Sequence, residues 1–357
     1  PDNLGAPNRA PGVEPYIRFV VDDVLLKAGQ REYLDPRERW QVTDACFAFV
    51  EKCLASFDLG PFLAWAAAGG RAPPGGMSPL QHLVQHPGFD VLTRILGGSP
   101  LLETILTIVT AGYDSIRNNL AKTPLFTRCM VRCLRVIRRV LDVQSAFLEV
   151  VLPALSDSGM HVAQDKLARL KTLSPIDQSF LYHSEVVVQI ALLVACEEDD
   201  EMALLAVEIL RIVADSPFFD VQQRFPDQSR AKLNRLVGLL QASPETLRIQ
   251  EAFVQRLEED LPESELDSPE WSAPIGDAEV ELVKAENPGA LRRAIKTAIL
   301  DLFLACTRQD RSAPNVAHLL LGFNLRARPD EMEIEDPEAA DATRTCLHVV
   351  LELLAQN

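Results

Sequence analysis

The sequence has few aromatic residues and no long hydrophobic run. Aromatic side chains make up only 6% of the 357 residues, although 47% are hydrophobic. Helices suit this composition better than strands, which are rich in aromatic and β-branched residues. The longest apolar stretch, 186–196, has eleven residues, fewer than the roughly 20 of a membrane-spanning helix. The sequence therefore predicts an all-α protein without membrane insertion.

Basic residues are also scarce. The chain has 35 Lys and Arg residues against 51 Asp and Glu, which gives a net charge of −16. Nucleic acid is therefore not expected as the main ligand, because phosphate binding requires a basic surface. The cysteines number seven and lie within apolar helical stretches. An odd number of such cysteines indicates buried, reduced thiols in a reducing compartment.

Motifs for catalysis and cofactor binding are missing as well. The glycine pairs 69–70, 75–76 and 97–98 lack the following Gly-Lys-Ser/Thr of a phosphate-binding loop, and no Gly-x-Ser-x-Gly turn occurs. No histidine has an evident nucleophile as its partner. We therefore expect no catalytic residue, no cofactor and no small-molecule substrate. An enzyme whose groups meet only in three dimensions remains an alternative.

Two residue pairs have the spacing of metal ligands on a helix. His82 and His86 are four residues apart, but Pro87 follows at once and no Cys or acid stands at a matching distance. Cys129 and Cys133 have the same spacing within an apolar stretch, which is typical of core residues. A zinc site requires three or four ligands. The sequence therefore predicts no metal site.

The stretch Ile176–Ala214 has the pattern that most of the chain repeats. Ser174 and Pro175 form a helix start signal, and the apolar run 186–196 follows. The five acids at 197–201 end that run and lie at the start of a second helix, where the backbone dipole favours negative charge. The first helix is apolar nearly all round and must pack between others. Such helix pairs are the unit of an α-solenoid.

Prolines at helix starts recur along the chain. They occur at positions 100, 124, 175, 244 and 288 without a fixed sequence period. We therefore predict irregular HEAT- or armadillo-like repeats that form one continuous, superhelical α-solenoid segment, residues 1–357, of a larger protein. Besides the 176–214 pair, the pattern predicts helices at about 13–28, from 36, at 79–85, 87–96, 100–120, 124–141, 143–155, after the turn 157–159 to about 173, at 228–241, 244–259, 288–306 and 314–321, and a last one through 347–354.

Two segments interrupt the helical pattern. Residues 66–78 are rich in Ala, Gly and Pro and are expected to form a flexible loop. Residues 258–286 contain eleven acids and a single base, Lys284, together with several prolines. This composition predicts an acidic loop excursion, either disordered or draped over the surface.

Four arginines form the most distinctive polar feature. Arg128, Arg132, Arg135 and Arg139 follow one another at spacings of four, three and four, and no acid occurs between Asp114 and Asp142. A row of guanidinium groups on an acidic protein fits an acidic partner segment. The other interpretation is that the arginines form a solvated face or pair with acids of an adjacent repeat. We favour this interpretation, because most charged rows on protein surfaces have no partner-binding role.

Three stretches of the chain resemble a known family. They are 32–59, which contains Glu-Tyr-Leu-Asp-Pro-Arg-Glu-Arg-Trp-Gln, then 313–325, which contains Asn-Val-Ala-His-Leu-Leu-Leu-Gly-Phe, and 344–351. Together they are similar to the middle region of the large inner-ring scaffold nucleoporins of the nuclear pore complex, the type called one-ninety-two in fungi and two-hundred-five in vertebrates. The sister scaffold nucleoporin one-eighty-eight remains an alternative.

The resemblance implies an α-helical scaffold at the nuclear pore in the nuclear envelope. It also implies partners: other inner-ring nucleoporins, whose short linear segments thread across solenoid surfaces and support nucleocytoplasmic transport. A karyopherin-like transport receptor is the competing interpretation. Such a carrier should have regular repeats of about 40 residues and inner helices lined with acids, Trp and Asn. This chain has no regular array of repeats, and its three tryptophans are widely spaced.

Overall fold

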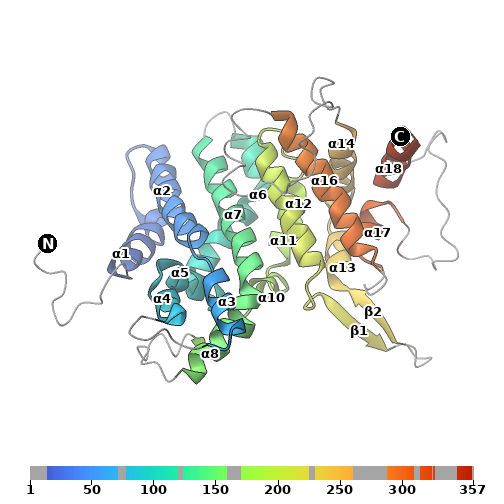
Figure 1. The fold of residues 1–357 in the computed structure, drawn as a ribbon. Helices are drawn as coiled ribbons and strands as arrows, with labels where there is room; N and C mark the ends of the chain where they lie inside the picture. The colour runs from blue at the N-terminus through green and yellow to red at the C-terminus, as the bar shows by residue number, and fades with distance from the viewer. Residues whose placement is uncertain are drawn as a thin grey trace, which may run out of the picture. The chain divides into compact units, whose positions relative to one another are not determined.

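The computed structural model describes residues 14–70, 78–119, 124–158, 170–224, 230–259, 288–308, 314–323, 325 and 344–355. Most of the predicted loop 66–78 and nearly all of the predicted acidic excursion 258–286 lie outside these residues. The chain divides into two compact units, residues 1–182 and 183–357. Both consist mainly of helices (Figure 1), so the predicted all-α fold is confirmed.

The first unit is built around the helix pair α2 and α7. Asp35 caps α2, since its carboxylate accepts a hydrogen bond from the backbone N–H of Arg37 at 2.8 Å. The helices of this unit are α1 (Glu14–Arg18), the π-helix η1 (Phe19–Leu25), the 3₁₀ turn η2 (Ala28–Gln30), α2 (Pro36–Ala55), α3 (Gly60–Ala67), α4 (Pro79–Gln85), α5 (Pro87–Leu96), α6 (Pro100–Asn119), α7 (Pro124–Ala146), the π-helix η3 (Phe147–Val151), α8 (Leu152–Asp157) and α10 (Ile176–Phe180).

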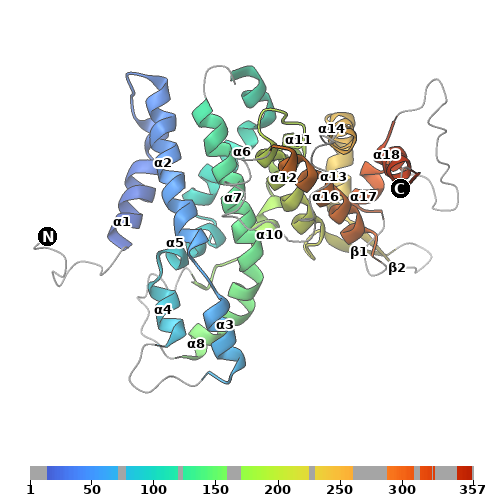
Figure 2. The same cartoon turned by 45° about the horizontal axis from the view of Figure 1, so that its top comes forward.

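Helix α2 packs along α7 on one side and against α5 on another, and the two views in Figures 1 and 2 agree on the first contact. Phe57, Phe89 and Phe147 are fully buried, and the ring of Phe147 contacts the rings of the other two. Gly88 allows the start of α5 to approach α2, because a Cβ there would collide with Phe57. The core of the first unit is therefore aromatic at this end.

The second unit is built around α12, which packs against α11 and α16. Asp199 caps α12, as its carboxylate accepts from the backbone N–H groups of Glu201 and Met202 at 3.1 and 3.3 Å. The elements of this unit are α11 (Ser184–Leu193), α12 (Asp200–Ala214), the antiparallel strands β1 (Asp220–Arg224) and β2 (Arg230–Asn234), α13 (Arg235–Ala242), α14 (Thr246–Glu258), α16 (Pro288–Cys306), α17 (Val316–Leu320) and α18 (Cys346–Ala355).

Most of the predicted helices are confirmed, but α3 was not predicted, and its last residues, 66–67, lie in the predicted loop 66–78. Two helix predictions are also wrong in part. The helices predicted at 79–85 and 87–96 are confirmed as α4 and α5. The helix predicted at 228–241 is wrong over 230–234, where the backbone pairs with β1 instead. Asn234 caps α13, accepting from the backbone N–H of Leu236 at 2.9 Å, so the helix begins only at Arg235.

The predicted long helix after Ser174–Pro175 is also interrupted. Residues 181–183 leave the helix between α10 and α11, and Tyr182 is 80% exposed. The side chain of Gln144 binds Ile176 and Asp177, which ties α10 to α7 in the first unit. Helix α11 packs instead against α12 in the second unit. The predicted helix pair is therefore confirmed only for α11 and α12.

Among the described residues, no single helix is long and apolar enough to cross a membrane. Helices α5 and α6 satisfy the length and composition criteria only when taken together, and they are bent by 70° relative to each other.

Candidate docking surface

The arginine stripe lies on α7 and faces α2. Asp44 of α2 is shared by two of its members: Arg128 Nη2 lies 2.8 Å from Oδ2, and Arg132 Nε lies 2.8 Å from Oδ1. Glu51 lies two helical turns further along α2 and is shared by two arginines in the same way. Its carboxylate lies 2.5 Å from Arg132 and 2.9 Å from Arg135.

The last arginine of the stripe binds the backbone rather than a carboxylate. Arg139 donates to the carbonyl of Phe57 at 2.8 Å and to that of Leu54 at 3.4 Å. Both carbonyls lie at the C-terminal end of α2, where the helix dipole favours a cation. We call Arg128, Arg132, Arg135 and Arg139, with Asp44 and Glu51, the arginine ladder.

The ladder arises from matching spacings on two packed helices. Asp44 and Glu51 are seven residues apart, so they lie on one face of α2, and the arginines on α7 follow the same repeat. The structure therefore shows pairing with acids of a neighbouring helix. At the exposed end of the ladder, Arg128 keeps N–H donors in contact with solvent, because a guanidinium has five N–H groups and this side chain is 59% exposed. Partner binding at the ladder stays a prediction.

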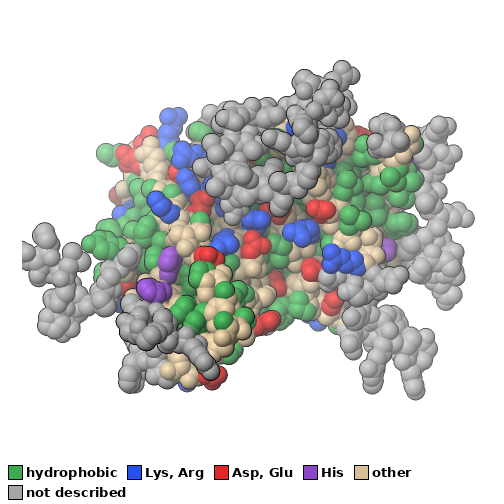
Figure 3. Space-filling view, viewed as in Figure 1, with side chains coloured by type: hydrophobic (Ala, Val, Ile, Leu, Met, Phe, Trp, Pro, Cys, Tyr) green, Lys and Arg blue, Asp and Glu red, His purple; other side chains and the backbone are tan. Residues whose placement is uncertain are grey.

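A cavity of about 300 Å³ lies beyond the end of α2, between that helix, α3 and α4. Histidine side chains reach the surface beside α4 in Figure 3. The cavity wall is largely apolar and includes the buried rings of Phe57 and Phe62. The lining residues are Ser56, Phe57, Asp58, Pro61, Phe62, Pro79, His82, Leu83 and His86.

The two histidines of this cavity are not arranged as metal ligands. His86 Nδ1 accepts a hydrogen bond from the backbone N–H of Gly88 at 3.0 Å, which caps α5. Burial lowers the pKa of His86, so its ring is neutral at pH 7. Within the part of the chain that the structure describes, no group of three or more His, Cys, Asp or Glu side chains could hold a metal ion.

The cysteines are buried and unreactive. All seven are free and buried. Burial raises the pKa of Cys53 to about 11 and that of Cys129 to about 12, and burial raises the pKa of Cys133 well above its ordinary value. Because only the thiolate is a nucleophile, these side chains act as small hydrophobic residues at pH 7.

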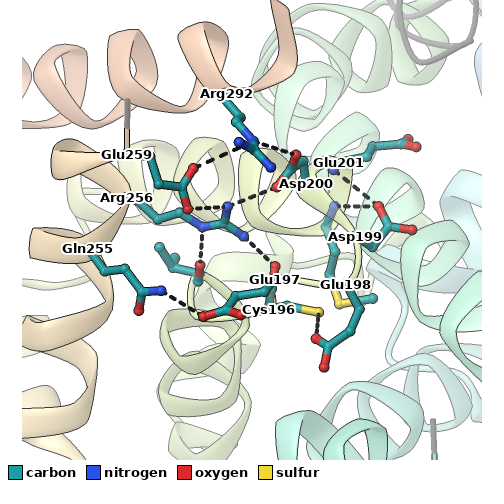
Figure 4. Close-up of polar contacts among 12 residues, drawn as sticks. Cys196, Glu197, Glu198, Asp199, Asp200, Glu201, Gln255, Arg256, Glu259 and Arg292 are labelled. Carbon is teal, nitrogen blue, oxygen red and sulfur yellow. Dashed lines mark hydrogen bonds and ion pairs between the residues drawn. The ribbon is translucent and has the colours of Figure 1, made fainter. Parts of the chain in front are cut away.

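In the second unit, the acidic turn 197–201 surrounds one buried arginine (Figure 4). The side chain of Arg256, on α14, is only 3% exposed. Its Nε donates to the carbonyl of Val194 at 3.0 Å, and its Nη2 donates to that of Cys196. Its Nη1 lies 2.8 Å from Asp200 and 2.9 Å from Glu259. One guanidinium therefore binds the end of α11, the start of α12 and the end of α14.

The acids of this turn differ in their partners. Glu197 accepts from Gln255 at 2.6 Å, and Glu198 accepts from the thiol of Cys196 at 3.3 Å. Arg292, on α16, adds a longer contact of 3.6 Å to Asp200 (Figure 4). The turn is therefore held by α14 and α16. The sequence predicted that these acids lie at a helix start, but it did not predict their contacts with Arg256. A charge beside Phe253, Val254 and Leu257 on the apolar face of α14 was the available signal.

Packed helix pairs, ion pairs between helices and buried thiols define an all-α protein built from helix pairs. A sequence model of the nuclear pore complex scaffold family, nucleoporins 186/192/205, matches residues 1–357. The chain therefore belongs to this family, and the resemblance found in the sequence is confirmed.

Relatives of known identity match most of the chain. The human Nuclear pore complex protein Nup205 is 24% identical over 366 residues, which cover 100% of this chain and 16% of the human protein. Nucleoporin NUP192 of Chaetomium thermophilum is 22% identical over 359 residues, or 99% of this chain and 19% of its own length. Nucleoporin nup186 of Schizosaccharomyces pombe is 22% identical over 330 residues, 91% of this chain and 18% of its own length.

The chain spans less than a fifth of the length of these relatives. Membership of the family places it in the scaffold of the nuclear pore complex, at the nuclear envelope.

Proposed function

We propose that this chain is a non-catalytic scaffold segment that docks linear segments of other inner-ring nucleoporins and so supports nucleocytoplasmic transport. Membership of the scaffold family supports the architectural part of this proposal. The arginine ladder supports the docking part, because it presents guanidinium groups along a helix whose inner side is already fixed by α2.

The exposed end of the ladder is the observation that carries the proposal. Arg128 binds Asp44 through Nη2, and its side chain is 59% exposed. The inner contacts hold the guanidinium planes in place, which lowers the entropy cost of binding a further carboxylate. An acidic linear segment that lies along α7 would then pair with the outward N–H groups, starting at Arg128.

Calorimetry of this chain against the linker segments of the other inner-ring nucleoporins tests the docking function. For a segment that binds, Arg128→Gln should weaken the affinity about threefold to tenfold, since a charged hydrogen bond contributes about 1 kcal/mol or more. Lys171→Gln is the matched control, because it removes one positive charge from an exposed position of the same unit. It should leave the affinity within about twofold, as surface charges away from the site contribute little.

Charge reversal at Arg132 or Arg135 is a poor test of docking, because the introduced acid would lie against Glu51 and destabilise the helix pair itself. Binding that Arg128→Gln leaves unchanged would remove the ladder as the docking site. Absence of binding by every segment would overturn the docking function and make this part of the protein a spacer.

A further inference from the structure

We propose that the cavity between α2, α3 and α4 receives one aromatic or large aliphatic side chain of a linear protein segment, flanked in that segment by Lys or Arg. This inference rests on the proposed docking function and names a second, chemically different contact for it. Three properties of the cavity carry it: its size and lining, one available hydrogen-bond donor, and its charge.

The size and lining fit an apolar anchor. A cavity of about 150 Å³ lined by aliphatic and aromatic side chains holds benzene, and this one is about 300 Å³. Its floor contains Phe57, Phe62 and Leu83, which are all buried, and Pro61 and Pro79 complete the apolar wall. Anchors of this kind dominate protein interfaces when they fill such concave, apolar pockets.

The wall offers one oriented donor. His86 Nδ1 accepts from Gly88, so in the neutral ring the proton resides on Nε2. The ring is held against Phe57 at a centroid distance of 5.4 Å. No described residue accepts a hydrogen bond from Nε2 of His86. A backbone carbonyl beside the anchor would satisfy this donor, which favours a peptide over a small hydrocarbon.

The charge of the lining favours a basic neighbour. Among the described residues that line the cavity, Asp58 is the only carboxylate and none is Lys or Arg. One carboxylate oxygen of Asp58 accepts from the backbone N–H of Gly60 at 2.8 Å, which fixes the side chain near the opening. A cation next to the anchor would meet this carboxylate, whereas an acid would be repelled.

Two contacts hold Phe57 in the cavity wall. Arg139 of the arginine ladder binds the carbonyl of Phe57 at 2.8 Å, and Gly88 brings α5 against the same phenylalanine. The cavity therefore forms before a partner arrives, which reduces the ordering cost of binding. It also adjoins the ladder, since Arg139 of the ladder binds Phe57 in the cavity wall.

Three synthetic peptides test the occupant directly: one with a central Phe between two Lys, a second with Ala in place of Phe, and a third with Glu in place of both Lys. Ligand-observed saturation-transfer NMR measures their affinity for the intact chain. The first should bind with a Kd on the order of 1 mM, as expected for one anchor, and the other two at least fivefold more weakly. Equal affinities for the Phe and Ala peptides would overturn the proposal.

Paired variants locate the site. His82→Trp places a larger ring at the cavity mouth and should weaken the first peptide at least fivefold. Gln85→Trp, an exposed position of the same helix that does not line the cavity, should have no effect. Asp58→Asn keeps the acceptor for Gly60 and should weaken the Lys-flanked peptide about threefold, while Asp157→Asn on α8 should not.

The outcomes separate this inference from the function on which it rests. If a nucleoporin segment binds the chain and His82→Trp does not weaken it, docking stands and the cavity proposal fails. If the Phe peptide binds at the cavity and no nucleoporin segment binds the chain, the cavity proposal stands and the proposed function fails.

Discussion

Residues 1–182 contain 18 acidic and 19 basic residues, whereas residues 183–357 contain 33 acidic and 16 basic residues. The acidity of the chain therefore belongs to the second unit, and the first is nearly neutral. The partners that each attracts by charge should differ accordingly. An acidic segment fits the arginine ladder of the first unit, and no such segment would be drawn to the second.

Both units nevertheless contain the same device, a carboxylate shared by two arginines. In the first unit Asp44 binds Arg132, whose side chain is 21% exposed, and Arg128, which is 59% exposed. In the second, Asp200 binds Arg256, which is 3% exposed, and Arg292, which is 47% exposed. The free energy of unfolding that is lost when an ion-pair partner is removed increases with the burial of that partner. We therefore expect removal of these four arginines to destabilise the chain in the order of their burial.

The largest effect is expected for Arg256→Met. This substitution keeps most of the side-chain volume but leaves the carbonyls of Val194 and Cys196 and the carboxylate of Asp200 without their donor. Loss of a buried partner costs about 3–5 kcal/mol. Urea unfolding should show this loss, and amide hydrogen exchange should accelerate in α11 and α12 while α2 and α7 keep their protection.

Arg292→Met is the matched control, because it removes the exposed arginine that contacts the same carboxylate at a longer distance. It should cost less than about 1 kcal/mol. Equal losses for the two variants, or faster exchange in α2 and α7 as well, would show that burial does not separate these two arginines.

A smaller effect is expected for Arg132→Met in the first unit. Arg132 binds both Asp44 and Glu51, so the substitution leaves two partly buried carboxylates with fewer donors. Its partial exposure allows water to replace part of the interaction, and we expect a loss of about 1–3 kcal/mol. Arg128→Met, which shares Asp44, should cost less than about 1 kcal/mol. The reverse order in urea unfolding would contradict the series.

Local signals in the sequence predicted much of this fold. The Asp35-Pro36 start of α2, and the bounds of α4 and α5, follow from caps and prolines within a few residues of each helix end. The arginine stripe was also visible, because its spacing is a property of one helix. Its acidic partners were not, since Asp44 lies 84 residues from Arg128.

The features that the sequence analysis missed depend on distant contacts. Arg256 meets Val194 across 62 residues of chain, and the cavity combines the end of α2 with α3 and α4. The break at residues 181–183 results from packing, because Gln144 holds α10 while α12 packs on α11. Periodicity within one segment contains no information on these pairings.

One buried thiol lies beside the shared carboxylate of each unit, and both thiols should make the stability of the chain depend on pH. Burial raises the pKa of Cys129, beside the ladder, and of Cys196, beside the acidic turn, to about 12 in each case. The ordinary value is 9.0. Above pH 9 the unfolded chain therefore loses these protons and the folded chain keeps them, so stability is complete below that pH and falls as the pH rises toward 12.

Each of these two thiols should cost about 1.4 kcal/mol of stability at pH 10, since this pH lies one unit above the unfolded pKa and one pKa unit corresponds to about 1.4 kcal/mol. The stability difference between the native chain and Cys129→Ala, measured by urea unfolding, should therefore shrink by that amount between pH 7.5 and pH 10. Met130→Ala, at an equally buried neighbour that does not titrate, should show a constant difference. Cys196→Ala should behave like Cys129→Ala, because burial dominates in both units although arginines surround one thiol and acids the other. A pH-dependent difference for only one of the two would show that the neighbouring charges, rather than burial, control these thiols.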